Sequence, residues 1–205
     1  MKWRRALQVA GALTLAATGF GLARATPIVT VGGRVERGRY LVSAMGCGGC
    51  HTPKTMGPAG PKSDESRFLS GHPEGSSLGP PPDLAGPWVG VSSWDTTAWA
   101  GPWGVSYSAN LTSDENTGIG SWSEETFVRA LRTGRHMGVS RPILPPMPWK
   151  AFRNLTDEDL RSMYAYLRTV PPVRNRVPEP LPPPEPRSVS RGGGPDSDSG
   201  SSRTP

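Results

Sequence analysis

The sequence predicts an all-α fold in which three to five short helices are joined by long loops rich in glycine and proline. Three segments carry apolar residues at helical spacing, within residues 34–46, 123–134 and 156–170. Residues 52–121 are rich in Gly, Pro and Ser and show no sustained period, which is typical of loops. We expect the first and last helices to pack across each other.

Each predicted helix has one apolar or small face and a residue that caps or ends it. The first helix ends at Gly46. The second begins after the capping residue Ser123 and ends at Gly134. The third begins after Thr156 and ends before Pro171. The faces are formed by Gly38, Leu41, Val42 and Met45 in the first helix, Phe127, Val128 and Leu131 in the second, and Leu160, Met163, Tyr164 and Leu167 in the third.

The two ends of the chain differ from the central domain, which we place at residues 26–170. Residues 1–25 begin with a basic run, continue with an uncharged apolar stretch and end in Ala23-Arg24-Ala25, which predicts a signal peptide. A retained anchor helix is the alternative, because the apolar stretch approaches the ~20 residues that span a bilayer. Residues 171–205 are mostly Pro, Ser, Gly and Arg, so we expect a disordered tail.

The net charge does not indicate a nucleic-acid partner. The formal charge is +6, with 23 basic and 17 acidic residues. Four of the basic residues lie in the predicted signal peptide, and its removal leaves 19 against 17. No motif combines aromatic and basic residues in the manner of a nucleic-acid binding surface. We therefore exclude nucleic acid as a ligand.

The two cysteines of the chain carry its most specific motif. Cys47-Gly-Gly-Cys50-His51 matches the Cys-x-x-Cys-His attachment site of c-type haem. Two thiols three residues apart reach the two vinyl groups of one porphyrin, while the adjacent imidazole comes under the iron. A redox dithiol would be expected near a βαβ pattern, and a structural zinc site would need further Cys or His nearby. We therefore predict one covalent haem c, with His51 as an iron ligand.

A haem iron that shuttles electrons needs a sixth ligand, and methionine is the usual partner of histidine. Met147 lies in Leu144-Pro-Pro-Met147-Pro-Trp149, between the last two predicted helices. The three prolines restrict the backbone, so the loop can hold a thioether against iron at a lower ordering cost. The candidates in the chain are Met45, Met56, Met137, Met147, Met163, His72 and His136.

Most of the other candidates fit less well than Met147. Met45 is tied to the attachment motif on the histidine side of the ring, and Met163 lies on the apolar face of the last helix. Met56 follows the motif by only five residues, which is a short path around the ring. Met137 and His136 remain open as alternatives.

Five motifs together resemble a known family. They are Gly38-Arg-Tyr-Leu41, Cys47-Gly-Gly-Cys-His-Thr52, Ser108-x-Asn110-Leu-Thr112, Thr117-Gly-Ile-Gly-x-Trp122 and Leu144-Pro-Pro-Met-Pro-Trp149. Over about residues 34–170 the chain resembles class I cytochromes c, and more closely the haem domains of cytochrome subunits that serve membrane-bound dehydrogenases. The resemblance implies a low-spin, six-coordinate haem with His51 and Met147 as ligands. It also implies that Asn110 and Trp122 contact the haem edge or its propionates.

Four tryptophans between residues 88 and 103 form an insertion that is not part of this family pattern. They are Trp88, Trp94, Trp99 and Trp103. Because aromatic side chains are mostly buried, we expect them to pack over the haem pocket. An exposed docking patch is the alternative.

These observations predict an electron carrier rather than an enzyme. We expect it in the periplasm, accepting electrons from a dehydrogenase and passing them to an oxidase or another cytochrome. One alternative is a subunit that receives electrons only within a dehydrogenase complex. Another is a haem enzyme or sensor with an open iron position, suggested by the large insertion and three histidines. A retained signal segment would tether the domain to a membrane.

Overall fold

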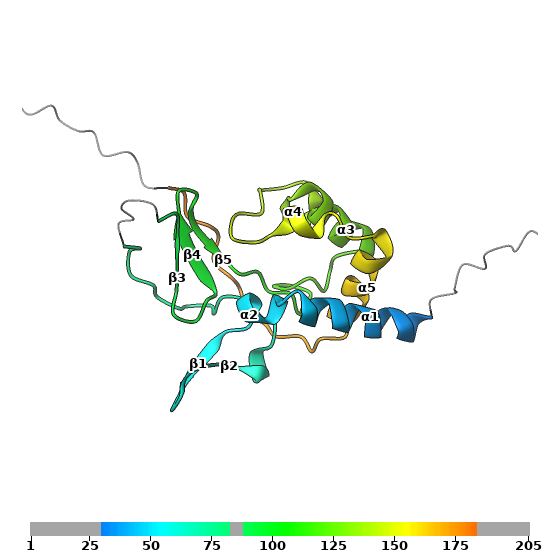
Figure 1. Ribbon diagram of the computed structural model, residues 1–205, viewed down its shortest axis with the longest axis horizontal. Helices are drawn as coiled ribbons and strands as arrows, with labels where there is room; N and C mark the ends of the chain where they lie inside the picture. The colour runs from blue at the N-terminus through cyan, green and yellow to red at the C-terminus, as the bar shows by residue number, and fades with distance from the viewer. Residues whose placement is uncertain (1–29, 83–87, 184–205) are drawn as a thin grey trace, which may run out of the picture.

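Five helices and five short strands make up the part of the chain that this computed structural model describes, residues 30–82 and 88–183 (Figure 1). The helices are α1 (Val31–Ala44), α2 (Cys47–His51), α3 (Glu124–Thr133), α4 (Trp149–Phe152) and α5 (Asp157–Leu167), with 3₁₀ turns η1 (Glu65–Arg67) and η2 (His136–Gly138). The strands are β1 (Lys54–Gly57), β2 (Gly60–Ser63), β3 (Val91–Ser92), β4 (Ala98–Gly101) and β5 (Gly104–Tyr107). The expectation of an all-α domain is therefore wrong in part.

The terminal segments lie largely outside the described residues. Residues 1–29, which include the predicted signal peptide, and residues 184–205 are not described. Within residues 30–82 and 88–183, no helix combines the length and apolar character needed to cross a bilayer.

Helix α1 begins three residues before the segment that its apolar pattern predicts. The hydroxyl of Thr30 accepts a hydrogen bond from the backbone N of Gly33 at 3.1 Å and caps the helix. The helix ends at Ala44, two residues before the predicted Gly46. Gly46 has a φ of 69°, in the left-handed region that favours glycine. This turn leads the chain directly from α1 into α2.

The capping residues predicted for the other two helices are confirmed. The Ser123 hydroxyl accepts a hydrogen bond from the backbone N of Thr126 at the start of α3. Gly134, with a φ of 66°, ends that helix. The Thr156 hydroxyl accepts from the backbone N of Asp159 at 3.1 Å at the start of α5. Local sequence therefore determines where these helices begin and end.

Helices α1 and α5 cross in close contact, as expected (Figure 1). The crossing depends on Gly38, where a Cβ atom would lie 1.8 Å from the backbone oxygen of Ser162. The apolar core forms around this crossing and under α3 and α4. Its buried members are Leu41, Val42, Leu69, Ile119, Phe127, Leu131, Phe152, Leu160, Met163, Leu167 and Val170.

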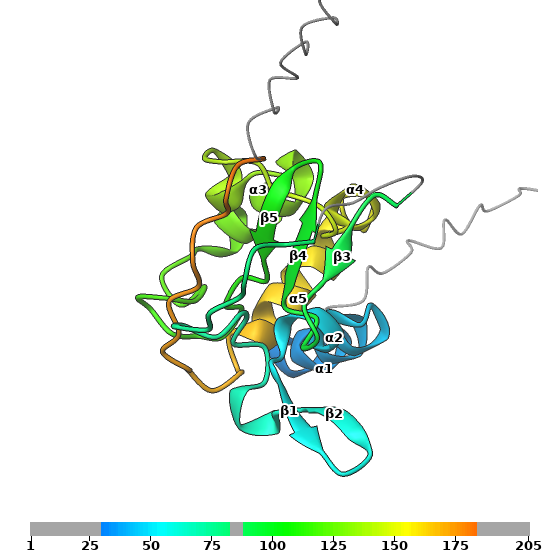
Figure 2. The same cartoon turned by 90° about the vertical axis from the view of Figure 1, so that its left-hand side faces the viewer.

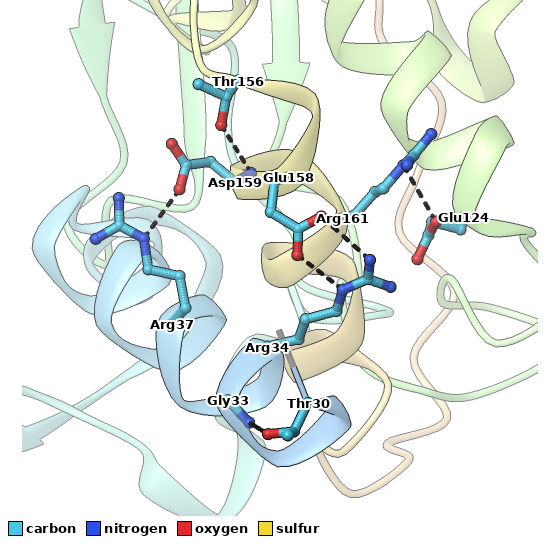
Figure 3. Close-up of polar contacts among 9 residues, drawn as sticks. All are labelled: Thr30, Gly33, Arg34, Arg37, Glu124, Thr156, Glu158, Asp159 and Arg161. Carbon is cyan, nitrogen blue, oxygen red and sulfur yellow. Dashed lines mark hydrogen bonds and ion pairs between the residues drawn. The ribbon is translucent and has the colours of Figure 1, made fainter. Parts of the chain in front are cut away.

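Ion pairs accompany the helix crossing (Figure 3). Arg34 and Arg37 reach from α1 to Glu158 and Asp159 in the first turn of α5, with N–O distances of 2.8 and 2.9 Å. Such pairs are partly exposed to solvent, so they contribute little to stability. They help to set the register of the two helices, while the absence of a side chain at Gly38 permits their close approach.

We predict that Gly38→Ala lowers the free energy of unfolding by about 2–3 kcal/mol or more, because its methyl group would overlap the α5 backbone. Gly32→Ala is the matched control, since a Cβ there meets nothing within 4 Å. It should stabilise α1 by up to about 1 kcal/mol through helix propensity. Chemical denaturation of both variants measures the difference. Equal stability of the two variants would contradict this account of the crossing.

The long segment between α2 and α3 contains the strands that the sequence pattern did not predict. Strands β1 and β2 form an antiparallel hairpin, and β3, β4 and β5 form a three-stranded antiparallel sheet (Figure 2). Each strand has only two to four residues. An alternation over such short runs is too brief to be recognised among flanking Gly and Pro residues.

The four tryptophans of the insertion divide into two packed and two exposed side chains. Trp99 is half-buried in β4, and a Cβ atom at Gly101 would lie 2.5 Å from the ring of Trp103. In contrast, Trp88 and Trp94 are 74% and 54% exposed. The expected packing over the haem pocket is therefore confirmed for Trp99 alone, which lines the cavity described below. Trp103 packs on Gly101 instead, and the expectation is wrong for the exposed Trp88 and Trp94.

The segment that follows α5 is ordered up to residue 183, and the prediction of disorder is wrong for residues 171–183. Figure 2 shows this segment, which we call the strap, running from the end of α5 up to β5. Leu181 pairs with Val105 of β5 through two backbone hydrogen bonds of 2.9 Å. The strap lies directly on Gly104, where a Cβ atom would come within 2.0 Å of the Leu181 oxygen. Tertiary contacts thus order a segment of low apolar content.

Asn175 provides the main polar anchor of the strap. Its side chain is 1% exposed, and its Nδ2 donates to the backbone oxygens of Ser70 and His72 at 2.7 and 2.8 Å. Its Oδ1 accepts from the Arg67 guanidinium at 2.9 Å and from the backbone N of Glu74 at 2.7 Å. All four bonds join the strap to η1 and the segment that follows it.

We predict that Asn175→Ala lowers the free energy of unfolding by about 2–4 kcal/mol, because it leaves several buried polar groups without partners. Asn154→Ala is the control, since the exposed Asn154 makes one side-chain bond, to the Lys150 oxygen. It should change stability by less than about 0.5 kcal/mol. Thermal or denaturant unfolding compares the two. If Asn175→Ala lowered the free energy of unfolding no more than Asn154→Ala does, the Asn175 side chain would not be the anchor of the strap.

Candidate functional site

A cavity of about 400 Å³ lies among the helices, β4, β5 and the strap. Its volume falls in the range of about 300–1,000 Å³ that is typical of small-ligand and cofactor sites. Every site residue predicted from the sequence lines it, and these residues are Cys47, Cys50, His51, Asn110, Trp122 and Met147. The fold therefore brings together residues that lie far apart in the chain.

Helix α2 consists of the attachment motif itself. Cys47 and Cys50 are three residues apart in this helix, so they lie on the same side of it and both line the cavity. A Cβ atom at Gly48 would lie 3.1 Å from the ring of Phe68, whereas one at Gly49 would meet nothing within 4 Å. Gly48 therefore allows close packing on Phe68.

His51 is held in one orientation at the end of α2. Its ring is 7% exposed, and Nδ1 lies 2.8 Å from the backbone oxygen of Ala109. Because a carbonyl oxygen only accepts, Nδ1 carries the proton and Nε2 keeps its lone pair. Burial lowers the pKa of His51, and the hydrogen bond to Ala109 acts in the opposite direction. A neutral imidazole held in this way is the usual arrangement of a metal ligand.

The environment of Cys47 does not favour a redox dithiol. Burial raises the pKa of the Cys47 thiol to about 11. Reactive dithiols instead have thiolates stabilised at or below neutral pH. The Cys47 sulfur is therefore not held as the reactive thiolate that a redox dithiol needs.

The loop that carries Met147 is tied down at three points. The Ser106 hydroxyl in β5 donates to the oxygen of Pro145 at 2.5 Å, and the backbone N of Ile143 donates to the oxygen of Gly134 at 2.8 Å. The indole of Trp149 lies over Gly134, where a Cβ atom would come within 2.3 Å of the ring. These contacts hold the loop against the cavity with Met147 in its wall.

The other candidate ligands separate into those that line the cavity and those that do not. Met45, Met163 and His136 line it, together with Met147. Met56 and Met137 are 66% and 44% exposed and do not line it. Met163 is also a buried member of the core, as predicted, and Met45 packs against that core. Of Met137 and His136, the two residues that remained as alternatives to Met147 for the sixth ligand, only His136 lines the cavity.

His136 and Trp122 form one part of the wall. Their rings meet edge to face, with centroids 5.3 Å apart and an interplanar angle of 84°. Burial lowers the pKa of His136, and the positive charge of Arg141 lowers it further. Trp122 also accepts a hydrogen bond at its backbone oxygen from the Tyr164 hydroxyl at 2.6 Å. The wall at this point is therefore aromatic, and Trp122 is tied to α5 through Tyr164.

Asn110 lines the cavity with its amide already bonded to protein partners. Its Nδ2 donates to the oxygens of Val173 and Asn175 in the strap, at 2.8 and 3.3 Å. Its Oδ1 accepts from the backbone N and the hydroxyl of Thr112, at 3.0 and 2.7 Å. Within the structure, Asn110 joins the cavity wall to the strap.

Sequence reasoning missed a buried polar chain beside the site. His72 is fully buried, its Nδ1 lies 2.8 Å from the Thr97 hydroxyl, and that hydroxyl donates to Asp95 at 2.7 Å. The ring of His72 stacks at 4.8 Å on Tyr107, which lines the cavity. His72 itself does not line the cavity, so it is not a ligand candidate. No local motif marks these residues, because they meet only through the fold of the insertion.

The donor set fits a haem. Two sulfurs share one side of α2, a neutral imidazole keeps a free lone pair, and a thioether lies in a separate loop of the same apolar cavity. These groups and the helical arrangement define a c-type cytochrome. The cytochrome c family model matches residues 35–171, and the chain belongs to the cytochrome c family.

Several curated proteins similar to this chain are named as subunits of dehydrogenases. The chain is 33% identical over 140 residues to the fructose dehydrogenase cytochrome subunit of Gluconobacter japonicus, covering 68% of this chain and 22% of that protein. It is 31% identical over 176 residues to the cytochrome c subunit of the quinone alcohol dehydrogenase of Gluconobacter oxydans, covering 84% and 29%. It is 33% identical over 144 residues to one of the subunits of the nicotinate dehydrogenase of Pseudomonas putida, covering 70% and 9%. The chain thus spans less than a third of each of these relatives.

Membership of this family establishes the cofactor and its general role. The domain carries covalent haem c with its iron, and Cys47 and Cys50 fit the attachment motif. The match to the cytochrome c family indicates a role in electron transfer. Two of the relatives are themselves named as cytochrome subunits of dehydrogenases.

We predict that Met147→Leu abolishes the weak absorption band near the red end of the ferric spectrum, because that band requires methionine sulfur on the iron. The same variant should have a lower reduction potential and bind carbon monoxide in the ferrous form. Met163→Leu is the control, since Met163 also lines the cavity. It should keep the band and exclude carbon monoxide. Optical spectra of both variants show which residue is the sixth ligand of the iron. If the band survived in Met147→Leu, Met147 would not be that ligand.

Proposed function

We propose that this chain is a periplasmic electron carrier with a single haem, attached through Cys47 and Cys50 and ligated by His51 and Met147. The observation that carries the proposal is the shared cavity, in which α2 supplies both sulfurs and the imidazole while the proline loop supplies the thioether. A haem bound here would supply one-electron redox chemistry. His51 and Met147 would be the residues that hold its iron.

Each part of the site has a defined task in this proposal. The hydrogen bond from His51 Nδ1 to the Ala109 oxygen fixes the imidazole and leaves Nε2 as the atom that would ligate the iron. The anchored Met147 loop supplies a soft ligand that raises the reduction potential. The apolar wall excludes water and lowers the local dielectric constant. Because both ligands are preorganised, little rearrangement accompanies electron transfer.

The proposed donor is a dehydrogenase, and the proposed acceptor is an oxidase or another cytochrome. Support comes from the relatives that are named as dehydrogenase cytochrome subunits. The chain works either as a free carrier or as a subunit within such a complex. Copurification with a dehydrogenase from membranes distinguishes the complex from the free carrier.

Export to the periplasm is proposed from the N-terminal sequence. Residues 1–25 have the basic, apolar and Ala-x-Ala parts of a signal peptide. Cleavage would release the domain, and retention would tether it to the membrane. The attachment of haem outside the cytoplasm in bacteria agrees with this location.

We expect the purified protein, made in a host competent for haem attachment, to have the mass of the chain from Thr26 onward plus one haem. It should stain for covalent haem on a denaturing gel. The double variant Cys47→Ala, Cys50→Ala should lose the stain and the added mass, because no thioether can form. Met56→Leu, an exposed change, serves as the control and should keep both. A wild-type mass equal to the bare polypeptide would refute the proposal.

A further inference from the structure

In the part of the chain that the structure describes, three charged side chains line the cavity wall, and we refer to them together as the charged cluster. Among the lining residues of the described chain, the fully charged ones are Arg141, Arg176 and Glu179. The remaining lining side chains are mostly apolar or aromatic. Arg141 belongs to the loop before Met147, while Arg176 and Glu179 belong to the strap. The cavity is therefore mostly apolar, with two cationic side chains and one anionic side chain in its wall.

Arg141 and Glu179 already form an ion pair. The Arg141 Nε lies 2.9 Å from Glu179 Oε2, and both side chains are exposed to solvent. Glu179 pairs with Arg141, and among the described residues it forms no ion pair with the Arg176 guanidinium. The cluster therefore adds a net positive charge to the cavity wall.

The position of Arg176 is determined by its neighbours in the strap. Asn175, directly before it, is anchored by the buried amide bonds described above. The backbone N of Arg176 itself donates to Glu74 Oε2 at 3.2 Å. On the other side of the cluster, Leu181 pairs with Val105 in β5. The strap is thus attached on both sides of Arg176 and Glu179.

A haem carries two propionate carboxylates, and burying a carboxylate in an apolar wall requires a cationic partner. We propose that the strap is part of the haem site, with Arg176 and Arg141 binding the two propionates and Glu179 offsetting part of their positive charge. The strap residues 172–183 lie beyond the family match, which ends at residue 171. This inference rests on the proposed function and adds a second, local determinant of the reduction potential.

The arginines and Glu179 should shift the reduction potential of the haem in opposite directions. Reduction removes one positive charge from the haem, so a nearby cation favours the ferrous form and a nearby anion favours the ferric form. Neutralising either arginine should therefore lower the reduction potential. Neutralising Glu179 should raise it, and it should also release Arg141 from its ion pair.

The experiment measures the midpoint potential of the haem-loaded full chain in Arg176→Gln, Arg141→Gln and Glu179→Gln. We expect the equilibrium constant for reduction to fall about threefold to tenfold in each arginine variant, where tenfold corresponds to about 59 mV for one electron. It should rise by a similar factor in Glu179→Gln. Arg174→Gln is the matched control, because Arg174 lies in the same strap but does not line the cavity.

Resonance Raman spectra of the same proteins test binding directly, since the propionate bending modes respond to hydrogen bonding. These modes should shift in Arg176→Gln and Arg141→Gln and stay unchanged in Arg174→Gln. Potentials that shift no more than in Arg174→Gln, or unshifted bending modes, would overturn the proposal. Intact haem stain and ligand bands in the variants would then show that the proposed function stands while the role of the strap fails.

Discussion

The close crossing of α1 and α5 is the constraint on which the rest of the structure depends. It requires a residue without a side chain at Gly38, where the α5 backbone occupies the space that a Cβ atom would need. Helix α1 continues through the left-handed turn at Gly46 into α2, so the crossing also determines where the sulfurs and the His51 imidazole lie. Helix α5 contributes Met163 and Leu167 to the same cavity. One backbone contact therefore connects the scaffold to the site.

Strand β5 holds the opposite side of the cavity together. The Ser106 hydroxyl binds the Pro145 oxygen in the Met147 loop, and Val105 pairs with Leu181 in the strap. The small sheet of the insertion is thus a support for two segments that close the cavity. Its exposed tryptophans, Trp88 and Trp94, lie outside that supporting role. The insertion serves the haem site mainly through hydrogen bonds.

The strap changes the electrostatics of an otherwise apolar site. Asn110 in the cavity wall and Asn175 in the strap are joined by a hydrogen bond, and Asn175 reaches on to the backbone near His72. These amides hold the strap beside the cavity, so that Arg176 and Glu179 line it at fixed positions. Mobile charges in a disordered tail would instead be screened by water and salt.

Local features of the sequence were sufficient for the attachment motif, the caps at Ser123 and Thr156, and the turn at Gly134. These depend on residues within a few positions of one another, so their chemistry can be read directly along the chain. The sequence also indicated Met147 as a residue of the cavity, because its proline-rich surroundings restrict the loop locally.

Only the tertiary structure decided that β5 supports the Met147 loop, that His72 is enclosed away from the cavity, and that residues 171–183 are ordered. Each depends on partners far away in the chain, such as Asn175 with Ser70 or Val105 with Leu181. Composition alone suggested disorder after α5, because few apolar residues are present there. Buried hydrogen bonds to distant backbone groups compensate for the ordering entropy, and no local pattern reveals such partners.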